Sequence, residues 1–346
     1  MRGVGGGPEV PTTSDVVDRL VREGDRYDAE AAFILSAASA WAYSDDRTFA
    51  DMMDRYGVPN ECAVMGLSND ALLLTATAYL LRSKDGRLAI LCFRGTEPRN
   101  LINWLLDAST EKDPLGTIGY LHGGFYRNVL ALWPYVLCRL VRTIEGVRPC
   151  PDLAPPSCGP DEPEPTTADC PKKPLEALYI TGHSLGGAMA VIAAALCFQR
   201  DSEPGLPNVY EQIRAKLRGV YTFGQPMVGD KDVAAWGEAT FGSKLFTHRY
   251  GVDIAPRLLP RTMGAFAPFG RQYVSTRFGW MQSSAPVRQT YTLLASNVLG
   301  AVAWLNQQIP ALSNVRLPFS WGDHSPLNYM RTSQIIRVGA EFPSRP

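Results

Sequence analysis

The sequence GHSLGG at residues 182–187 decides the fold. It follows a short apolar run at residues 178–181 and precedes strong helix formers at residues 188–196, which predicts a strand, a tight turn and a helix. A serine on such a turn, between two small residues, is typical of a nucleophile elbow. The turn leaves no room for side chains two residues before and after the serine, and glycine occupies both places. We therefore predict that Ser184 stands exposed above the sheet as a nucleophile.

A serine hydroxyl needs a histidine base and a carboxylate that orients this base. The chain has only four histidines. His183 is next to the nucleophile on the turn and is expected to point elsewhere, and His122 and His248 lie before the serine or before the best acid. In the fold that carries such elbows the order along the chain is serine, acid, histidine. This order selects His324 as the base.

The acid should lie between the serine and the base, at the end of a strand. Asp253 fits this place, because it follows a predicted strand at residues 245–250 and precedes a turn at residues 254–257. The alternative for this aspartate is a turn residue that caps local amides. Asp230 and Asp232 compete for the role, but both lie in a polar segment where a helix is expected to begin.

The end of a second predicted strand supplies a candidate residue for stabilising the oxyanion that forms when Ser184 attacks. Residues 88–93 form a continuous apolar run, which predicts a central strand, and Gly95 lets the backbone turn at its end. Thr96 then lies at the rim of the sheet with its amide and hydroxyl available. Together with the amide of Leu185, at the positive end of the next helix, it would form an oxyanion hole with two donors.

Six separated blocks of the sequence resemble the class 3 lipases, the fungal-lipase-like branch of the α/β-hydrolases, and occur in the order of that family. They are FRGTE at 93–97, NWLLD at 103–107, HGGF at 122–125, YTFGQPMVGD at 221–230, DIAPR at 253–257 and DHSPLNY at 323–329. The resemblance implies an α/β-hydrolase fold, with a mostly parallel central sheet, helices on both faces and a lid segment. Two departures concern Gly251, where the family commonly has asparagine, and the length of residues 262–320.

The expected reaction is the hydrolysis of a carboxylic ester through an acyl-enzyme, in which Ser184 attacks, His324 moves the proton and Asp253 orients the histidine. This chemistry needs no metal and no other cofactor. The resemblance favours lipid esters, as in a triacylglycerol or acylglycerol lipase. The alternatives are an esterase for soluble short-chain or aromatic esters, a phospholipase A1-type activity, and a lipase-like scaffold without turnover.

Two apolar segments are expected to decide the substrate. The first, residues 100–106, is predicted to be a lid helix or a fixed wall of the pocket; its apolar side chains are Leu101, Ile102, Trp104 and Leu105. The second, residues 289–315, has no charged side chain. Its apolar residues repeat at helical spacing, which predicts a buried packing helix or an apolar cap that docks on lipid.

The composition of the 346 residues is that of a globular enzyme, with 45% hydrophobic residues and a net charge of zero. This charge predicts no nucleic-acid partner, and nothing implies a protein partner. A flexible tail is expected at residues 1–14, followed by one catalytic domain over residues 15–346. A proline-rich surface excursion at residues 147–174 lies within this domain.

The remaining patterns predict secondary structure and location. Residues 29–43 predict an amphipathic helix, residues 125–144 a second helix, and residues 75–93 a hairpin turned at residues 84–86. The first residues lack the apolar core of a secretion signal and no stretch is apolar enough to span a bilayer, so we expect a cytoplasmic protein with peripheral contact at a membrane or lipid-droplet surface.

The cysteines agree with this location. The chain has seven, and three of them, Cys150, Cys158 and Cys170, lie in the proline-rich excursion without the spacing of a zinc site. The simplest interpretation is free thiols in a reducing compartment, and a disulfide within the excursion is the alternative.

Overall fold

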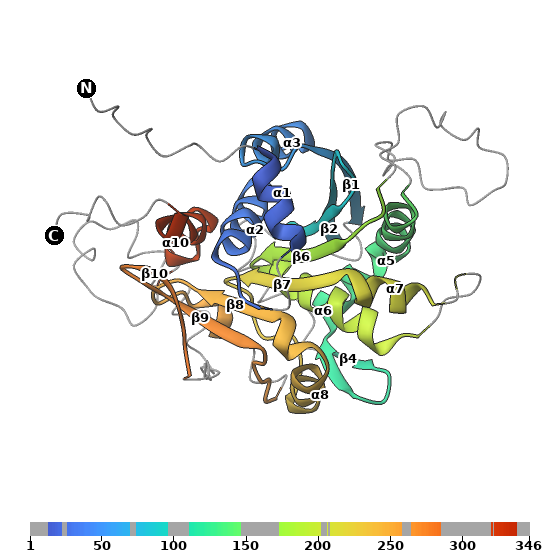
Figure 1. Ribbon diagram of the computed structural model, residues 1–346. Coiled ribbons are helices and arrows are strands. Elements are labelled where there is room, and N and C mark those ends of the chain that lie inside the picture. Colours follow the sequence, from blue (N-terminus) through green and yellow to red (C-terminus); the bar gives the residue numbers. More distant parts are fainter. Residues whose placement is uncertain are drawn as a thin grey trace, which may run out of the picture.

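The computed structural model describes residues 13–22, 26–69, 74–95, 111–146, 173–201, 206, 208–257, 264–284, 320 and 322–337. Its centre is an eight-stranded sheet in the order β1-β2-β3-β6-β7-β8-β9-β10 (Figure 1). The strands are β1 (Asn60–Asn69), β2 (Leu74–Ser83), β3 (Leu88–Phe93), β6 (Ala177–His183), β7 (Leu217–Phe223), β8 (Leu245–Arg249), β9 (Arg271–Thr276) and β10 (Gly279–Gln282). Strands β4 (Lys112–Leu115) and β5 (Gly119–His122) form a separate hairpin.

Strands β3, β6, β7, β8 and β9 run parallel, whereas β1, β2 and β10 pair antiparallel at the two sides of the sheet. The predicted mostly parallel sheet is therefore confirmed. Because parallel strands end at the same edge, the segments that follow β6, β7, β8 and β9 all begin there. Ligand sites in open α/β sheets form at this carboxyl edge.

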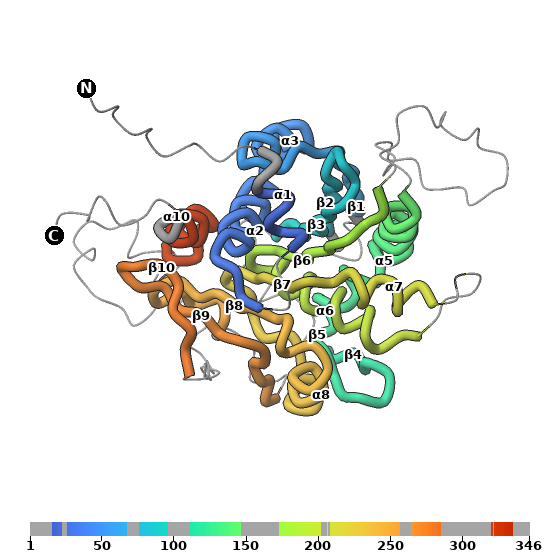
Figure 2. Tube along the Cα trace, viewed as in Figure 1, coloured from blue at the N-terminus to red at the C-terminus, as the bar shows by residue number. Residues whose placement is uncertain are grey.

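Helices cover both faces of the sheet (Figure 2). One face carries α1 (Thr13–Arg22), α2 (Ala29–Trp41), α3 (Asp46–Arg55) and α10 (Pro326–Arg337). The other face carries α5 (Gly123–Ile144), α6 (Leu185–Gln199), α7 (Val209–Lys216) and α8 (Lys231–Phe241). Short 3-10 turns lie at Gly242–Lys244, Ala255–Arg257 and Gly322–His324.

Strand β6 shows why the sequence folds as two helix layers around one sheet. Leu178 and Ile180 belong to the hydrophobic cluster on the side of α6, and Ala177 and Tyr179 to the cluster on the side of α2. A strand buried on both faces needs apolar residues at every position rather than at alternate ones. The short apolar run before the serine is the result.

The structure confirms most of the predicted elements and shifts their ends. The hairpin expected at residues 75–93 is formed by β2 and β3, and the helix expected at residues 125–144 is α5, which begins two residues earlier. Helix α1 begins at Thr13, inside the predicted tail. The amphipathic helix expected at residues 29–43 is α2, but Ala31–Ser39 are all buried because α2 lies between the sheet and the other helices on its face.

Several predicted segments lie outside the residues that the structure describes. They are the lid at residues 100–106, the uncharged segment at residues 289–315, and the proline-rich excursion at residues 147–174 except its last two residues, together with its three cysteines. Within the described helices, none is both long and apolar enough to span a membrane.

Candidate active site

Ser184 lies on a strained turn between β6 and α6. Its backbone has φ 58° and ψ −128°, a combination that side-chain-bearing residues rarely adopt. The turn is held from both sides, since the Ser184 amide donates to the Phe223 carbonyl at 2.9 Å and its carbonyl accepts from the Ala188 amide at 3.2 Å. Such strain persists only where the surrounding structure enforces it, and it is common at functional sites.

The two glycines of the elbow are required by close backbone contacts. A Cβ atom added to Gly182 would lie 2.3 Å from the backbone of Gly186. One added to Gly186 would lie 2.1 Å from the carbonyl oxygen of Phe93 on the neighbouring strand. The small residues predicted around Ser184 are therefore needed for β3, β6 and α6 to approach one another at this point.

The structure brings the three predicted triad residues together in one hydrogen-bonded chain. His324 Nδ1 lies 2.8 Å from Asp253 Oδ2, and His324 Nε2 lies 2.8 Å from Ser184 Oγ. Because an ionised carboxylate only accepts, Nδ1 carries the proton and donates to Asp253. Nε2 is then left as the acceptor for the Ser184 hydroxyl, which is the tautomer that a general base needs.

Parallel topology explains why residues so far apart in sequence meet. Ser184 follows β6, and Asp253 comes four residues after the end of β8, at the same edge of the sheet. His324 ends the 3-10 turn before α10. The Asp253 segment pairs with this region directly, since the amide of Ser320 donates to the Val252 carbonyl at 3.0 Å.

Asp230, the alternative candidate for the acid, has a structural role. Asp230 caps the start of α8, where its Oδ1 accepts from the amides of Asp232 and Val233 at 3.2 and 3.0 Å. Its Oδ2 accepts from the Tyr120 amide at 3.0 Å. Asp232 lies in the first turn of the same helix. Capping of this kind stabilises the helix and leaves neither carboxylate next to the histidine.

Tyr329 is a fourth member of the site, and its role was not predicted from the sequence. Its hydroxyl donates to Asp253 Oδ2, the same oxygen that accepts from His324, while the Ala255 amide donates to Asp253 Oδ1 at 2.9 Å. Burial, and after it the neighbouring Asp253 charge, raises the pKa of Tyr329 well above its ordinary value, so the hydroxyl keeps its proton. Tyr329 lies within the DHSPLNY block, on the first turns of α10, which was the available signal.

We expect Tyr329→Phe to lower kcat about threefold to tenfold, because Asp253 loses one of the donors that fix its orientation. The free energy of unfolding should fall by about 1 kcal/mol. Tyr179→Phe is the matched control, since this buried hydroxyl donates to the Leu20 carbonyl at 2.9 Å on the α1 side of the sheet. Steady-state kinetics should separate the two variants; equal kcat values for both would remove Tyr329 from the site.

The prediction that His183 points away from the site is wrong. Its ring packs against the ring of His324 with centroids 4.6 Å apart, and its Nδ1 lies 2.9 Å from the Tyr43 hydroxyl. Burial, and after it the proximity of His324, lowers the pKa of His183 well below its ordinary value. A neutral ring therefore supports the base from the side and adds no positive charge where His324 must accept a proton.

The prediction that Ser184 stands exposed is wrong. The relative exposures of Ser184, Asp253 and His324 are 0%, 0% and 1%. The elbow places the serine between β6 and α6, and in the folded chain none of its surface is accessible to solvent. A substrate can reach Oγ only after part of the protein moves.

Of the predicted oxyanion hole, the structure describes the start of α6. The Ala188 amide makes the first hydrogen bond to the Ser184 carbonyl, so the amide of Leu185 lies in the first turn, at the positive end of the helix. Gly95 lies close by, because a Cβ added there would fall 2.5 Å from the His183 carbonyl oxygen. Thr96 and the residues predicted to form a lid, Leu101, Ile102, Trp104 and Leu105, lie outside the described residues.

There is a structural reason for glycine at position 251, where class 3 lipases commonly have asparagine. This residue has φ 46°, and an added Cβ would lie 2.3 Å from Asp323 Oδ2. The same carboxylate accepts from the Val252 amide at 2.9 Å, which ties the segment before the acid to the residue before the base. Glycine at this position lets the two segments approach closely.

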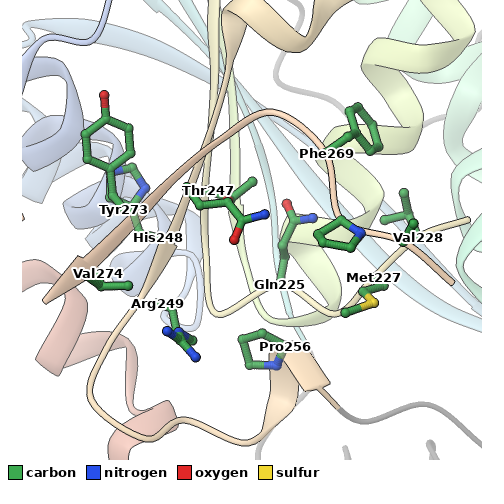
Figure 3. A pocket seen from close by; sticks show the side chains of 13 residues that line it. Gln225, Met227, Val228, Thr247, His248, Arg249, Pro256, Phe269, Tyr273 and Val274 are labelled. Carbon is green, nitrogen blue, oxygen red and sulfur yellow. The ribbon is translucent and has the colours of Figure 1, made fainter. Parts of the chain in front are cut away.

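A pocket opens beside the acid loop, the segment at residues 250–257 that follows β8 and holds Asp253 (Figure 3). Its lining includes Gln225 and Met227 from the loop after β7, Thr247 and Arg249 from β8, and Pro256 just after the acid. No triad side chain lines it. The pocket is therefore a separate hollow that shares loops with the site.

A mostly parallel sheet covered by helices on both faces, with serine, histidine and aspartate joined at its carboxyl edge, defines an α/β-hydrolase with a catalytic-triad arrangement. Residues 165–263 match the model of the family described as Lipase (class 3). This match confirms the resemblance to the class 3 lipases.

Two plant proteins are among the similar relatives. Triacylglycerol lipase OBL1 of Arabidopsis thaliana is 27% identical over 243 residues, which cover 64% of this chain and 44% of the relative. The protein of the same name from Ricinus communis is 25% identical over 321 residues, or 80% of this chain and 58% of the relative. The chain thus spans about half the length of these relatives.

Solved fungal lipases share the fold. The Rhizomucor miehei lipase in complex with its propeptide aligns with a TM-score of 0.53 and 20% identity, over 85% of this chain and 78% of that chain. A triacylglycerol lipase whose catalytic centre is formed by a serine protease triad aligns with the same TM-score and identity, over 85% and 91%.

Proposed function

We propose that this protein hydrolyses carboxylic esters of lipids through an acyl-enzyme formed on Ser184. The observation that supports this most directly is the chain of two 2.8 Å contacts that joins Ser184, His324 and Asp253 at a strained elbow. A turn that only connected a strand to a helix would have no reason to hold a serine in a strained conformation against a histidine of the correct tautomer.

The proposed reaction follows from this geometry. Ser184 Oγ attacks the ester carbonyl carbon while its proton passes to His324 Nε2, and Asp253 stabilises the imidazolium. The tetrahedral intermediate expels the alcohol, which takes the proton from His324. Water then repeats the sequence on the acyl-serine and releases the acid. The amides of Leu185 and Thr96 are the proposed donors to the oxyanion.

Three observations support lipid esters as the substrates. The class 3 family model matches the segment that holds the serine and the acid. Similar relatives are named triacylglycerol lipases. The buried triad also requires an opening step, and an apolar lid at residues 100–106 that moves at a lipid surface would provide it.

The proposed setting is the cytoplasm, with transient contact at the surface of a membrane or lipid droplet. Floating lipid droplets from a cell lysate and probing each fraction for the protein tests this setting. We expect a dominant soluble pool and a smaller pool on the droplets. Recovery of the whole protein in a secretory or vesicular fraction would contradict it.

A panel of esters with graded acyl length, assayed with and without vesicles, tests the substrate class. We expect activity on a long-chain ester to rise when the substrate passes its solubility limit, because the lid then exchanges water for acyl chains. Trp104→Ser should reduce this rise and spare a short soluble ester. No rise at the limit, with a chain-length preference that shifts in solution, would favour a soluble esterase.

A further inference from the structure

Exposed large apolar side chains are few in the described part of the chain, and most of them gather in one region. The five are Tyr120, Val252, Phe278, Met281 and Leu327. Phe278, at 67%, is the most exposed of these. Four of the five lie on the acid loop, the β9–β10 hairpin and the first turn of α10, whereas Tyr120 lies on β5.

Topology places this group at the edge that carries the triad. Strand β9 is parallel to β8, so the turn that follows β9 and holds Phe278 lies at the carboxyl edge. Val252 directly precedes Asp253, and Leu327 comes three residues after His324. Figure 1 shows the β9–β10 turn and α10 on the same side of the molecule, well away from the β4–β5 hairpin.

Hydrogen bonds connect the β9–β10 hairpin to the segments that precede Asp253 and His324. Ser275 Oγ, near the end of β9, accepts from the Gly251 amide at 2.8 Å. The next amide, that of Val252, donates to Asp323 Oδ2 at 2.9 Å. The hairpin, the segment before the acid and the segment before the base are thus joined one to the next.

The hairpin is anchored to α10 directly beside its turn, whereas Phe278 in the turn stays exposed. Trp280 Nε1 donates to Ser333 Oγ of α10 at 2.8 Å, and the Trp280 ring stacks on Tyr329 with centroids 5.9 Å apart. At the tip, the Arg277 guanidinium lies 4.6 Å from the centre of the exposed Phe278 ring. An aromatic ring that leaves two thirds of its surface in water gains little from folding, so the fold itself does not explain it.

We propose that the β9–β10 turn, through Phe278 and Arg277, docks the protein on a phospholipid surface and so turns the triad edge towards lipid. Phe278 would insert at the boundary between head groups and acyl chains, and Arg277 would contact lipid phosphate. This inference rests on the proposed function for its purpose, since a lipid ester must enter at this edge.

The size and charge of the exposed pair, Phe278 and Arg277, favour a lipid surface over a second protein chain as the binding partner. A stable protein interface buries at least about 1,200 Å² in total, with a well-packed apolar centre. One projecting ring paired with a cation is too small a surface for this. It is sufficient for an interfacial anchor, because a single aromatic side chain next to a basic one can insert locally.

Binding to vesicles of phosphatidylcholine and phosphatidylserine, measured by co-sedimentation of the full chain, tests the proposal. Phe278→Ser should weaken binding about tenfold, and Phe278→Trp should restore it. Arg277→Gln should weaken binding about fivefold, and less on vesicles without phosphatidylserine. The matched control is Tyr120→Ser, which removes an exposed aromatic ring on β5 and should bind as the unchanged protein does.

Hydrolysis of a short soluble ester, measured on the same variants, keeps this proposal separate from the proposed function. Unchanged kcat/KM for Phe278→Ser together with weaker vesicle binding would support docking. Equal vesicle binding by Phe278→Ser and the unchanged protein would overturn it, as would no vesicle binding at all or a Phe278-dependent dimer without lipid. Absence of any ester turnover, with Phe278-dependent vesicle binding intact, would instead overturn only the proposed function.

Discussion

Ser184→Ala is expected to lower kcat on any ester by a factor on the order of 10⁶ and to abolish labelling by an organophosphonate. The hydroxyl lies 2.8 Å from His324 Nε2, so its loss removes both the nucleophile and the proton that the histidine accepts. The turn is held by backbone hydrogen bonds to Phe223 and Ala188, which alanine can still make. The fold should therefore survive the substitution.

Thermal unfolding and a matched serine variant make this test specific. Ser36→Ala removes another buried hydroxyl, one that donates to the Phe33 carbonyl at 2.8 Å inside α2. It should change stability by about 1 kcal/mol and leave kcat unaltered. If Ser184→Ala kept both labelling and turnover, the reaction would belong to another residue.

Asp253→Asn is expected to lower kcat by about 10⁴ with little change in structure. The carboxylate accepts from His324 Nδ1, Tyr329 and the Ala255 amide, and this places the histidine proton on Nδ1. An amide group of the same shape presents a donor, which favours the tautomer with the proton on Nε2. His324 could then no longer accept the proton of Ser184.

Asp230→Asn is the control for this second prediction. Asp230 caps α8 and also accepts from the Tyr120 amide, so its substitution should cost about 1 kcal/mol of stability and leave kcat near its original value. Kinetic constants and unfolding curves for both variants decide between the two acids. A large kcat loss for Asp230→Asn with a small one for Asp253→Asn would move the acid to Asp230.

The parts of the site that could be predicted from the sequence are those with local signatures. The elbow can be recognised from a run of adjacent residues, because the strand, the turn and the helix that form it each need particular residue types. The order of serine, acid and base along the chain then left His324 and Asp253 as the best candidates. The structure places His324 next to Ser184 and Asp253 next to His324.

Features that depend on packing between distant segments could not be predicted. Ser184 is completely buried, and the residues around it in the sequence do not predict this burial. Helix α10 packs against α2 on one face of the sheet. Tyr329 of α10 there contacts Asp253, and Tyr43, just after α2, contacts His183. The same packing buries α2 all round, where its sequence predicted one exposed face.

The central claim is that Ser184 forms a covalent intermediate, and mapping the adduct of an alkyl phosphonate on the unchanged protein by peptide mass spectrometry tests it most directly. We predict a single modified peptide, the one that holds residues 182–187, with the added mass on Ser184 and none in protein pretreated with an ester-type competitor. An adduct on any other residue, or no adduct while esters are still hydrolysed, would contradict the account.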